Sequence, residues 1–191
     1  MPVLYVRIPE DRVGVAIGPG GSVKRALAAS THTEIETGPE EGEFRIAGPD
    51  DGDPLAVLKA RDYLLAIGRG FSPERARRLL RDDTYLAVID IKVVSGKRGK
   101  SQLWRIRSRL IGSEGKARER LEELSGCSVS VYGSTVAVIG RERELDRATQ
   151  AIELLLHGSE HSTVFHMLAR QRLDDAREAA STPAEGDELP E

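Results

Sequence analysis

The sequence predicts an α+β protein made of two copies of one small unit, a linker helix between them and a C-terminal helix. Three observations lead to this prediction. The segment IGPGGSVKRAL, which starts at Ile17, aligns with IGSEGKARERL, which starts at Ile111, at an offset of 94 residues. Each segment is followed by a pair of short strand-like runs and then by a helix with a regular apolar stripe. An internal repeat of this kind indicates one architecture used twice.

Each copy has the predicted order strand, helix, glycine loop, helix, strand, strand, helix. The first strand is VLYVRI in one copy and TYLAVIDIKVV in the other. After the loop and its helix come TEIET and FRIAG in the first copy, and SVSVY and VAVIG in the second. The last helix carries apolar residues three and four positions apart, a spacing typical of a helix face turned toward a core. These residues are Val57, Ala60, Leu64 and Ile67 in the first copy and Leu145, Ala148, Ile152 and Leu155 in the second.

These elements predict the domain boundaries. We expect the first copy at 1–70, a linker helix at 71–83, the second copy at 84–158, a C-terminal helix at 159–180 and a disordered acidic tail at 181–191. A serine followed by a proline is typical of a helix start, and this pair opens the linker helix. The tail is rich in proline and acidic residues, a composition that does not support a packed core.

Composition excludes several classes of protein. Apolar residues make up 39% of the 191 residues, enough for packed cores, but Cys127 is the single cysteine, so no internal disulfide can form. No apolar run reaches the roughly 18 residues of a membrane span, and the first residues lack the pattern of a signal peptide. His157 and His161 are four residues apart but lack a third ligand for zinc. We therefore expect a cytoplasmic protein without membrane contact, metal or cofactor.

Charge is distributed unevenly along the chain. The formal net charge is only -3, yet the segment 92–120 holds ten basic residues against two acidic ones. Such a block is typical of a surface that binds nucleic acid, although a solvated charged helix remains the alternative. About eleven extra residues, VSGKRGKSQLW, precede the second glycine loop. Within them, Lys97, Arg98 and Lys100 are candidates for secondary contacts with phosphates.

The spacing of the glycines in the two loops distinguishes between three known phosphate-binding motifs. A dinucleotide fingerprint G-x-G-x-x-G fails because Val23 stands at the last glycine position, and a Walker loop at SGKRGKS fails because Val94 stands where its first glycine should be. A G-x-x-G turn between two helices fits both copies, and it lets a nucleic-acid backbone approach the start of the second helix. The loop residues are Gly18, Pro19, Gly20 and Gly21 in one copy and Gly112, Ser113, Glu114 and Gly115 in the other.

With these loops in this order of elements, the chain resembles a pair of type I KH domains. Its ending, HSTVFHML, and the basic insertion resemble archaeal members of the small-subunit ribosomal RNA processing family that includes the eukaryotic partner of the Nob endonuclease. The resemblance implies a three-stranded antiparallel sheet in each copy, with helices packed on one face. It also implies binding to single-stranded RNA at the 3′ end region of 16S ribosomal RNA or its precursor, cooperation with a Nob-type endonuclease and contact with a translation initiation factor subunit.

The candidate RNA-binding residues follow from a groove between the helices and the strand after them. Besides the loop residues, they are Ile17, Lys24, Ile35, Arg107, Ile111, Lys116, Arg118, Val129 and Val131. The aliphatic members would form a floor for bases, with core packing as the alternative role. Pro19 lacks a backbone donor and Glu114 brings a carboxylate, so both loops depart from the usual pattern. The surrounding arginines and lysines predict that the second copy is the main RNA contact.

Some roles stay open at this point. We expect Trp104 to anchor the inserted helix, with stacking on a base as the alternative. The linker arginines either extend the RNA surface or pair with the acidic loops; they are Arg75, Arg77, Arg78 and Arg81. The predicted function is that of a monomeric, non-catalytic RNA-binding factor, and the alternative is a protein interaction adaptor whose KH folds have lost RNA affinity. No arrangement of catalytic groups recurs at fitting spacing, so an enzyme is not expected.

Overall fold

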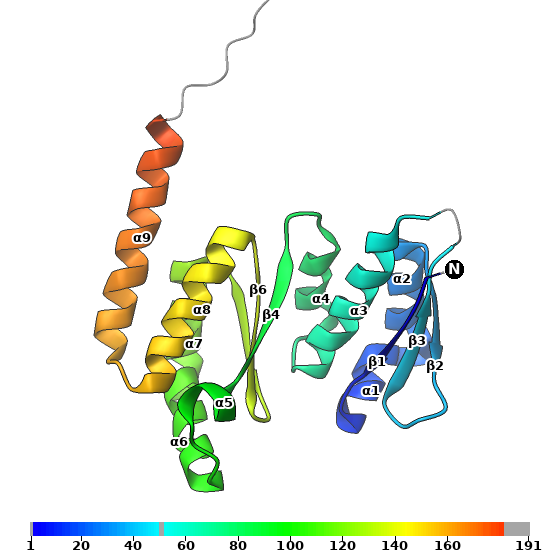
Figure 1. The fold of residues 1–191 in the computed structure, drawn as a ribbon, viewed down its shortest axis with the longest axis horizontal. Coiled ribbons are helices and arrows are strands. Elements are labelled where there is room, and N and C mark those ends of the chain that lie inside the picture. The colour runs from blue at the N-terminus through cyan, green and yellow to red at the C-terminus, as the bar shows by residue number, and fades with distance from the viewer. Residues whose placement is uncertain (1, 50–51, 182–191) are drawn as a thin grey trace, which may run out of the picture.

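The computed structural model describes residues 2–49 and 52–181, and it contains the same run of elements twice (Figure 1). The first copy consists of β1 (Val3–Arg7), α1 (Glu10–Ile17), α2 (Ser22–Thr31), β2 (Glu34–Thr37), β3 (Glu43–Ala47) and α3 (Pro54–Gly68). The second consists of β4 (Tyr85–Asp90), α5 (Ile91–Ser95), α6 (Lys100–Ile111), α7 (Lys116–Ser125), β5 (Ser128–Tyr132), β6 (Thr135–Gly140) and α8 (Glu142–His157). The inserted residues of the second copy thus run from the end of α5 into the first part of α6, which is longer than α1.

Shorter elements join these units. The glycine loops contain the single 3₁₀ turns η1 (Pro19–Gly21) and η3 (Ser113–Gly115). The linker forms α4 (Pro73–Ala76) and η2 (Arg77–Leu80), and the C-terminal helix is α9 (His161–Ser181). The expected disordered tail falls on residues that lie outside the described ones, apart from Ser181 at the end of α9.

Each copy has a three-stranded antiparallel sheet, with strand order β1-β3-β2 in the first and β4-β6-β5 in the second. The last strand in the sequence therefore lies in the middle, and β2 and β5 are edge strands. The predicted α+β fold, in which the helices of each copy pack on one face of its own sheet, is confirmed. Side chains alternate between the two faces of the first sheet, and this alternation sets the register of its strands. Phe44 and Ile46 of β3 are fully buried beneath the helices, whereas Tyr5 of β1 is 60% exposed on the opposite face.

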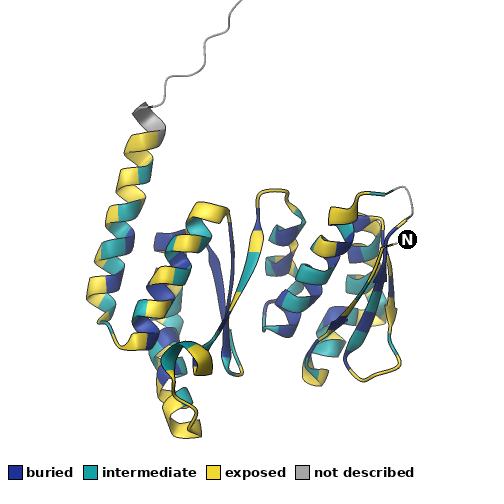
Figure 2. Ribbon diagram, viewed as in Figure 1, coloured by how far each residue is buried: buried dark blue, intermediate teal, exposed yellow. Residues whose placement is uncertain are grey.

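The second sheet is buried on both faces. Val136 and Val138 of β6 pack in the core of the second copy, whereas Ala137 and Ile139 pack in a cluster with residues of the first copy and the linker, including Phe71. All six residues of β6 are buried. Accordingly, α3 and α4 lie between the two sheets in Figure 1, and β6 is dark along its length in Figure 2. The two copies therefore share an apolar interface that fixes their relative placement.

Helix ends follow signals in the sequence. Asp53 caps α3 by accepting a hydrogen bond from the N–H of Leu55 at 2.9 Å, and Ser72 accepts one from the N–H of Arg75 at 3.4 Å. Proline follows each capping residue, as is common at the first position of a helix. At the other end of the chain, α9 packs against α7 and α8 through the buried side chains of its first half. Among the described helices, none combines the length and the apolar character needed to span a bilayer.

Candidate nucleic-acid interface

The two glycine loops have nearly the same backbone conformation. Gly18 follows α1 with φ 73° and ψ 171°, and Gly112 follows α6 with φ 73° and ψ 178°. The middle residue of the next turn is left-handed in both copies: Gly20 has φ 56° and ψ 22°, and Glu114 has φ 55° and ψ 22°. The repeat in the sequence is therefore also a repeat in backbone geometry.

The first glycine of each loop is required because two helices meet there. A Cβ atom at Gly18 would lie 2.4 Å from Cγ2 of Val23, and one at Gly112 would lie 2.6 Å from Cβ of Ala117. The dihedral angles of both glycines also fall in a region that is essentially restricted to glycine. The resulting turn is sharp and leaves its middle residues exposed to solvent.

Both helices that follow the loops begin without a side-chain cap. Gly21 is the N-cap of α2 and Gly115 is the N-cap of α7, and both are left-handed. The first N–H groups of such a helix have no acceptor within the helix, and the helix dipole adds a positive partial charge there. Next to exposed loop backbone, this arrangement suits a phosphate group.

The side chains around the two loops differ in charge. In the first loop, Nη1 of Arg25 donates a hydrogen bond to the carbonyl oxygen of Gly20 at 2.6 Å, which holds a guanidinium beside the turn. In the second loop, Nζ of Lys116 lies 2.9 Å from a carboxylate oxygen of Glu114, and both side chains are more than two-thirds exposed. The carboxylate that the sequence placed in this loop is thus paired with a neighbouring lysine through a weak surface contact.

The basic insertion lies at one end of the second copy. In Figure 1, α5 lies beside the second sheet and the start of α6 projects past the end of the sheet, and Figure 2 shows that this projecting part is largely exposed. Within the described part of the chain, Lys97, Arg98 and Lys100 take part in no ion pair, and all three are exposed. Arg107, further along α6, is half-buried, and its Nε has no hydrogen-bond partner among the described residues.

The other predicted contact residues differ in solvent exposure: some are exposed, some are half-buried and two are buried. The exposed ones are Pro19, Gly20, Ser113, Glu114 and Lys116. The half-buried ones are Ile17, Gly18, Gly21, Lys24, Ile111, Gly112, Gly115, Arg118 and Val131. Ile35 and Val129 are only 6% and 1% exposed and belong to the cores of their copies. Their strands can therefore offer a base the backbone edge, but these two side chains are engaged in core packing.

The free edges of β2 and β5 are not equivalent. The N–H of Val129 in β5 donates to Oε1 of Glu122 at 2.6 Å, so a side chain of α7 occupies one donor of this edge. Because backbone groups alternate in direction along a strand, Val131 directs its N–H and C=O toward the same open edge. At the position of Glu122 in the first copy stands Ala28, which has no carboxylate to offer. The first groove thus keeps a backbone donor that the second uses internally.

Comparison with known proteins agrees with this geometry. Residues 3–66 match the KH domain family, and residues 85–173 match a family described as eukaryotic type KH domain, KH-domain type I. A KH domain-containing protein of Methanocaldococcus jannaschii is 43% identical over 168 residues, which are 87% of this chain and 73% of that protein. The crystal structure of Dim2p from Pyrococcus horikoshii is 46% identical, with a TM-score of 0.83, and the match covers 89% of this chain and 99% of that one.

This chain belongs to the Pno1/Dim2 family of tandem KH-domain proteins. The pre-rRNA-processing protein pno1 of Aspergillus fumigatus is 33% identical over 119 residues, and the match covers 62% of this chain and 47% of that protein. A structure of an a/eIF2alpha–aDim2p–rRNA complex from Pyrococcus horikoshii has a TM-score of 0.84 at 46% identity and covers 91% of this chain and 95% of that one. KH domains are RNA-binding modules, so the family membership makes this an RNA-binding protein of a ribosomal RNA processing family.

Direct polar contacts fix the first KH domain against the second. Arg12 of α1 donates hydrogen bonds to the carbonyl oxygens of Ile67 and Phe71 at 2.9 and 2.7 Å, which satisfies the end of α3. Its guanidinium carbon lies 5.9 Å from the ring centre of Tyr132 in β5. The hydroxyl of Tyr132 in turn donates to the carboxylate of Asp11. One side of β5 is therefore committed to the domain interface, and its other side faces the core of the second KH domain.

The linker arginines also attach to the second KH domain. Arg75 forms an ion pair with Glu122, and Arg78 donates to Oγ of Ser128 at 2.9 Å and to the carbonyl oxygen of Gly126 at 3.2 Å. The sequence had left open whether these arginines bind RNA or pair with the acidic loops. For these two, the structure shows a third outcome, because both hold the linker against α7 and β5.

Trp104 does not have the anchoring role expected for it. Its side chain stands on α6 and is 66% exposed, so it is not packed into the body of the KH domain. The helix is anchored instead by Ile106 and Leu110, which are buried, and by Arg109, which donates to the carbonyl oxygens of Gly158 and Ser159. The spacing of Ile106 and Leu110, four residues apart, carried this signal in the sequence.

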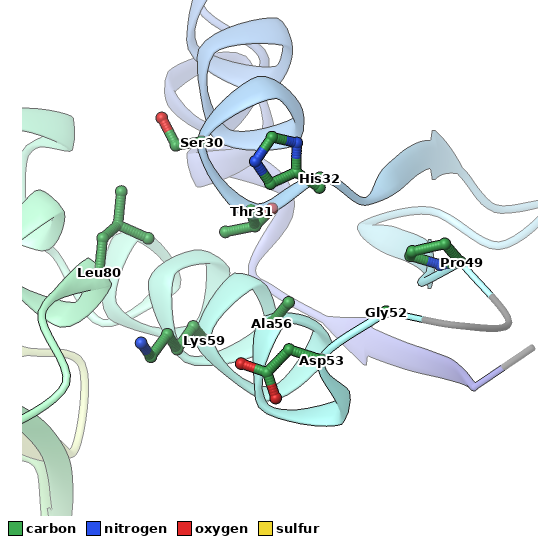
Figure 3. Close-up of a pocket in the computed structure, with 9 residues that line it drawn as sticks. All are labelled: Ser30, Thr31, His32, Pro49, Gly52, Asp53, Ala56, Lys59 and Leu80. Carbon is green, nitrogen blue, oxygen red and sulfur yellow. The ribbon is translucent and has the colours of Figure 1, made fainter.

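A pocket lies away from both loops, between the end of α2, the start of α3 and the linker (Figure 3). It has a volume of about 360 Å³ and is lined by Ser30, Thr31, His32, Pro49, Gly52, Asp53, Ala56, Lys59 and Leu80. Several of its polar groups are already engaged: Asp53 caps α3, Lys59 pairs with Asp82, and Thr31 donates to the carbonyl oxygen of Leu27 at 2.8 Å. None of the residues that line the pocket belongs to either glycine loop.

Proposed function

We propose that this protein binds single-stranded RNA in the 3′ end region of 16S ribosomal RNA or its precursor, during maturation of the small ribosomal subunit. The observation that carries the proposal is the pair of matched loops, each with exposed backbone next to an uncapped helix start. The relative that was crystallised in a complex with rRNA supports ribosomal RNA as the ligand class. Each KH groove would hold about four nucleotides of an unpaired strand.

The second KH domain is proposed as the main contact. Its loop is flanked by Lys116 and Arg118 and is preceded by exposed cations that have no carboxylate partner among the described residues. In the first loop, Pro19 removes one N–H group from the turn, and Arg25 is already bonded to the loop carbonyl of Gly20. Phosphates would therefore gain more favourable contacts at the second loop than at the first.

The proposed role is non-catalytic. Glycine backbone, helix N-termini and cations bind and orient phosphates, and none of these groups is a nucleophile. We therefore propose that cleavage of precursor RNA is left to a Nob-type endonuclease that this protein assists. A translation initiation factor subunit is a second proposed partner, supported by the a/eIF2alpha complex of the Pyrococcus relative. The protein would act in the cytoplasm as a monomer.

A binding titration tests the proposal. The RNA would be an oligonucleotide with the 3′ end sequence of 16S RNA, and the control would be a shuffled oligonucleotide of the same composition. Gly21→Asp and Gly115→Asp form a matched pair, because both glycines are left-handed N-caps and neither added Cβ would meet backbone. The Gly115 variant should lose more affinity, and circular dichroism should show that both variants fold. A greater loss from the Gly21 variant would contradict the assignment of the main contact.

A protein interaction adaptor is the second candidate function. It is favoured by Glu114, whose carboxylate stands in the loop where phosphate would bind, and by the missing donor of Pro19. The same titration separates the two functions. If neither oligonucleotide binds at low salt, the RNA-binding proposal fails and the adaptor function is favoured.

A further inference from the structure

Trp104 is the single tryptophan of the chain, and its side chain is 66% exposed on the projecting start of α6. We propose that it is a stacking site for an unpaired RNA base, lying beyond the groove of the second KH domain. This inference rests on the proposed RNA binding and extends the contact past the roughly four nucleotides that a KH groove holds. Exposed aromatic rings that stack on bases are a general means of holding single-stranded nucleic acid.

The position of Trp104 on α6 aligns it with the loop. Arg107 and Ile111 follow it three and seven residues later, so the three side chains lie along one stripe of the helix. Ile111 is the last residue of α6, directly before Gly112 of the loop. Eight residues of helix place Trp104 about 12 Å along the axis from that glycine. An RNA strand that leaves the loop along this stripe would pass Arg107 and then reach the indole ring.

The charges around Trp104 favour RNA over a protein as the occupant. Residues 91–113 contain seven basic residues and no acidic one. Two of them, Arg105 directly after Trp104 and Lys100 four residues before it, are exposed and form no ion pair with any other described residue. Cores of protein interfaces are poor in lysine and in charge generally, whereas phosphates neutralise such a cluster.

The first KH domain provides an internal comparison. At the offset of the repeat, Glu10 and Asp11 occupy the positions of Trp104 and Arg105. The pKa of the Glu10 carboxyl is raised by a hydrogen bond with Glu41 and by repulsion from that carboxylate. Asp11 accepts the hydroxyl of Tyr132 at the domain interface. An acidic helix start of this kind repels phosphate, so the stacking site exists only in the second KH domain.

The test uses the emission of Trp104, which is free of background from other tryptophans. Fluorescein-labelled RNA of the 16S 3′ end would be lengthened stepwise at either end, with anisotropy reporting binding and tryptophan emission reporting stacking. We expect quenching only when the strand extends past the groove on one side. Trp104→Ala should weaken binding of that longer RNA by roughly 5- to 100-fold, and Trp104→Phe by less, because a ring remains.

Two controls make the outcome decisive. Leu173→Ala, on α9, removes a similarly exposed apolar side chain (61%) and should leave affinity unchanged. An abasic site at the stacking position should weaken binding to the wild type but not to Trp104→Ala. If anisotropy shows saturated RNA while the emission of Trp104 stays unchanged, or if Trp104→Ala binds the longer RNA within twofold of the wild type, the stacking site is ruled out and the proposed RNA binding stands. If the wild type binds no RNA at all, both proposals fail.

Discussion

Arg75 of the linker pairs with Glu122 of α7, and the same carboxylate oxygen accepts the N–H of Val129 at the edge of β5. One carboxylate therefore joins the interdomain linker to a groove strand of the second KH domain. Its side chain is 19% exposed, so it lies largely out of solvent. Two donors would lose their acceptor together if it were removed.

Replacing Glu122 with Ala should lower the free energy of unfolding by about 2 kcal/mol, because a partly buried cation and a buried N–H lose a charged acceptor. The measurement is a urea titration followed by circular dichroism. Glu123→Ala is the matched control: its side chain is 61% exposed and, among the described residues, forms an ion pair only with Arg120, also at the surface. The control should cost no more than about 0.5 kcal/mol. Equal losses in the two variants would contradict the role assigned to Glu122.

Within the first loop, two glycines should respond differently to alanine. Gly18→Ala should destabilise the protein by about 3 kcal/mol, because the added Cβ would lie 2.9 Å from the backbone nitrogen of Val23 and the dihedral angles are nearly restricted to glycine. Gly20→Ala should cost only about 1 kcal/mol, the strain of a left-handed residue, because no atom lies within 4 Å of its added Cβ. Thermal and urea unfolding check the order, and a larger loss at Gly20 would refute it.

Sequence patterns predicted the elements of both KH domains because the signals are local. The loop spacing, the capping residues Asp53 and Ser72 and the apolar stripes each lie within one turn or one helix. The repeat offset also contained an unused signal: Glu122 of α7 stands where Ala28 stands in the first copy, and a carboxylate that replaces an apolar residue on a helix beside a groove strand indicates a specific polar contact.

The domain interface could not be predicted in the same way. The contact of Tyr132 with Asp11 joins residues 121 positions apart, and no periodicity links them. The run TVAVIG of β6 did contain a hint, because a strand without polar alternation is typical of burial on both faces. For Trp104, an expected anchoring role was wrong because the apolar spacing of Ile106 and Leu110 already supplies the buried face of α6.

Cys127 gives the protein a pH dependence in alkaline solution. Burial raises the pKa of its thiol to about 11, from 9.0 for the free group. The folded state therefore holds a proton that the unfolded state releases, so stability is complete below pH 9 and falls as the pH rises toward 11, by about 2 kcal/mol. Urea titrations from pH 8 to 11 check this, with Cys127→Ala expected to show a shallower decline. An identical decline in the variant would assign the effect to other groups.

Glu114 should oppose RNA binding at the second KH loop. Its carboxylate stands where a phosphate would approach, and an added negative charge about 4 Å from another costs about 1 kcal/mol in water. Glu114→Gly should therefore raise RNA affinity about fivefold at low salt, with the gain shrinking as salt rises. Glycine also accepts φ 55° without strain, so the variant should fold. Glu123→Ala removes an equal charge from the last turn of α7 and should change affinity less, because Glu123 lies at the opposite end of that helix from the loop. If both variants gain equally, the effect is one of net charge and not of the carboxylate in the loop.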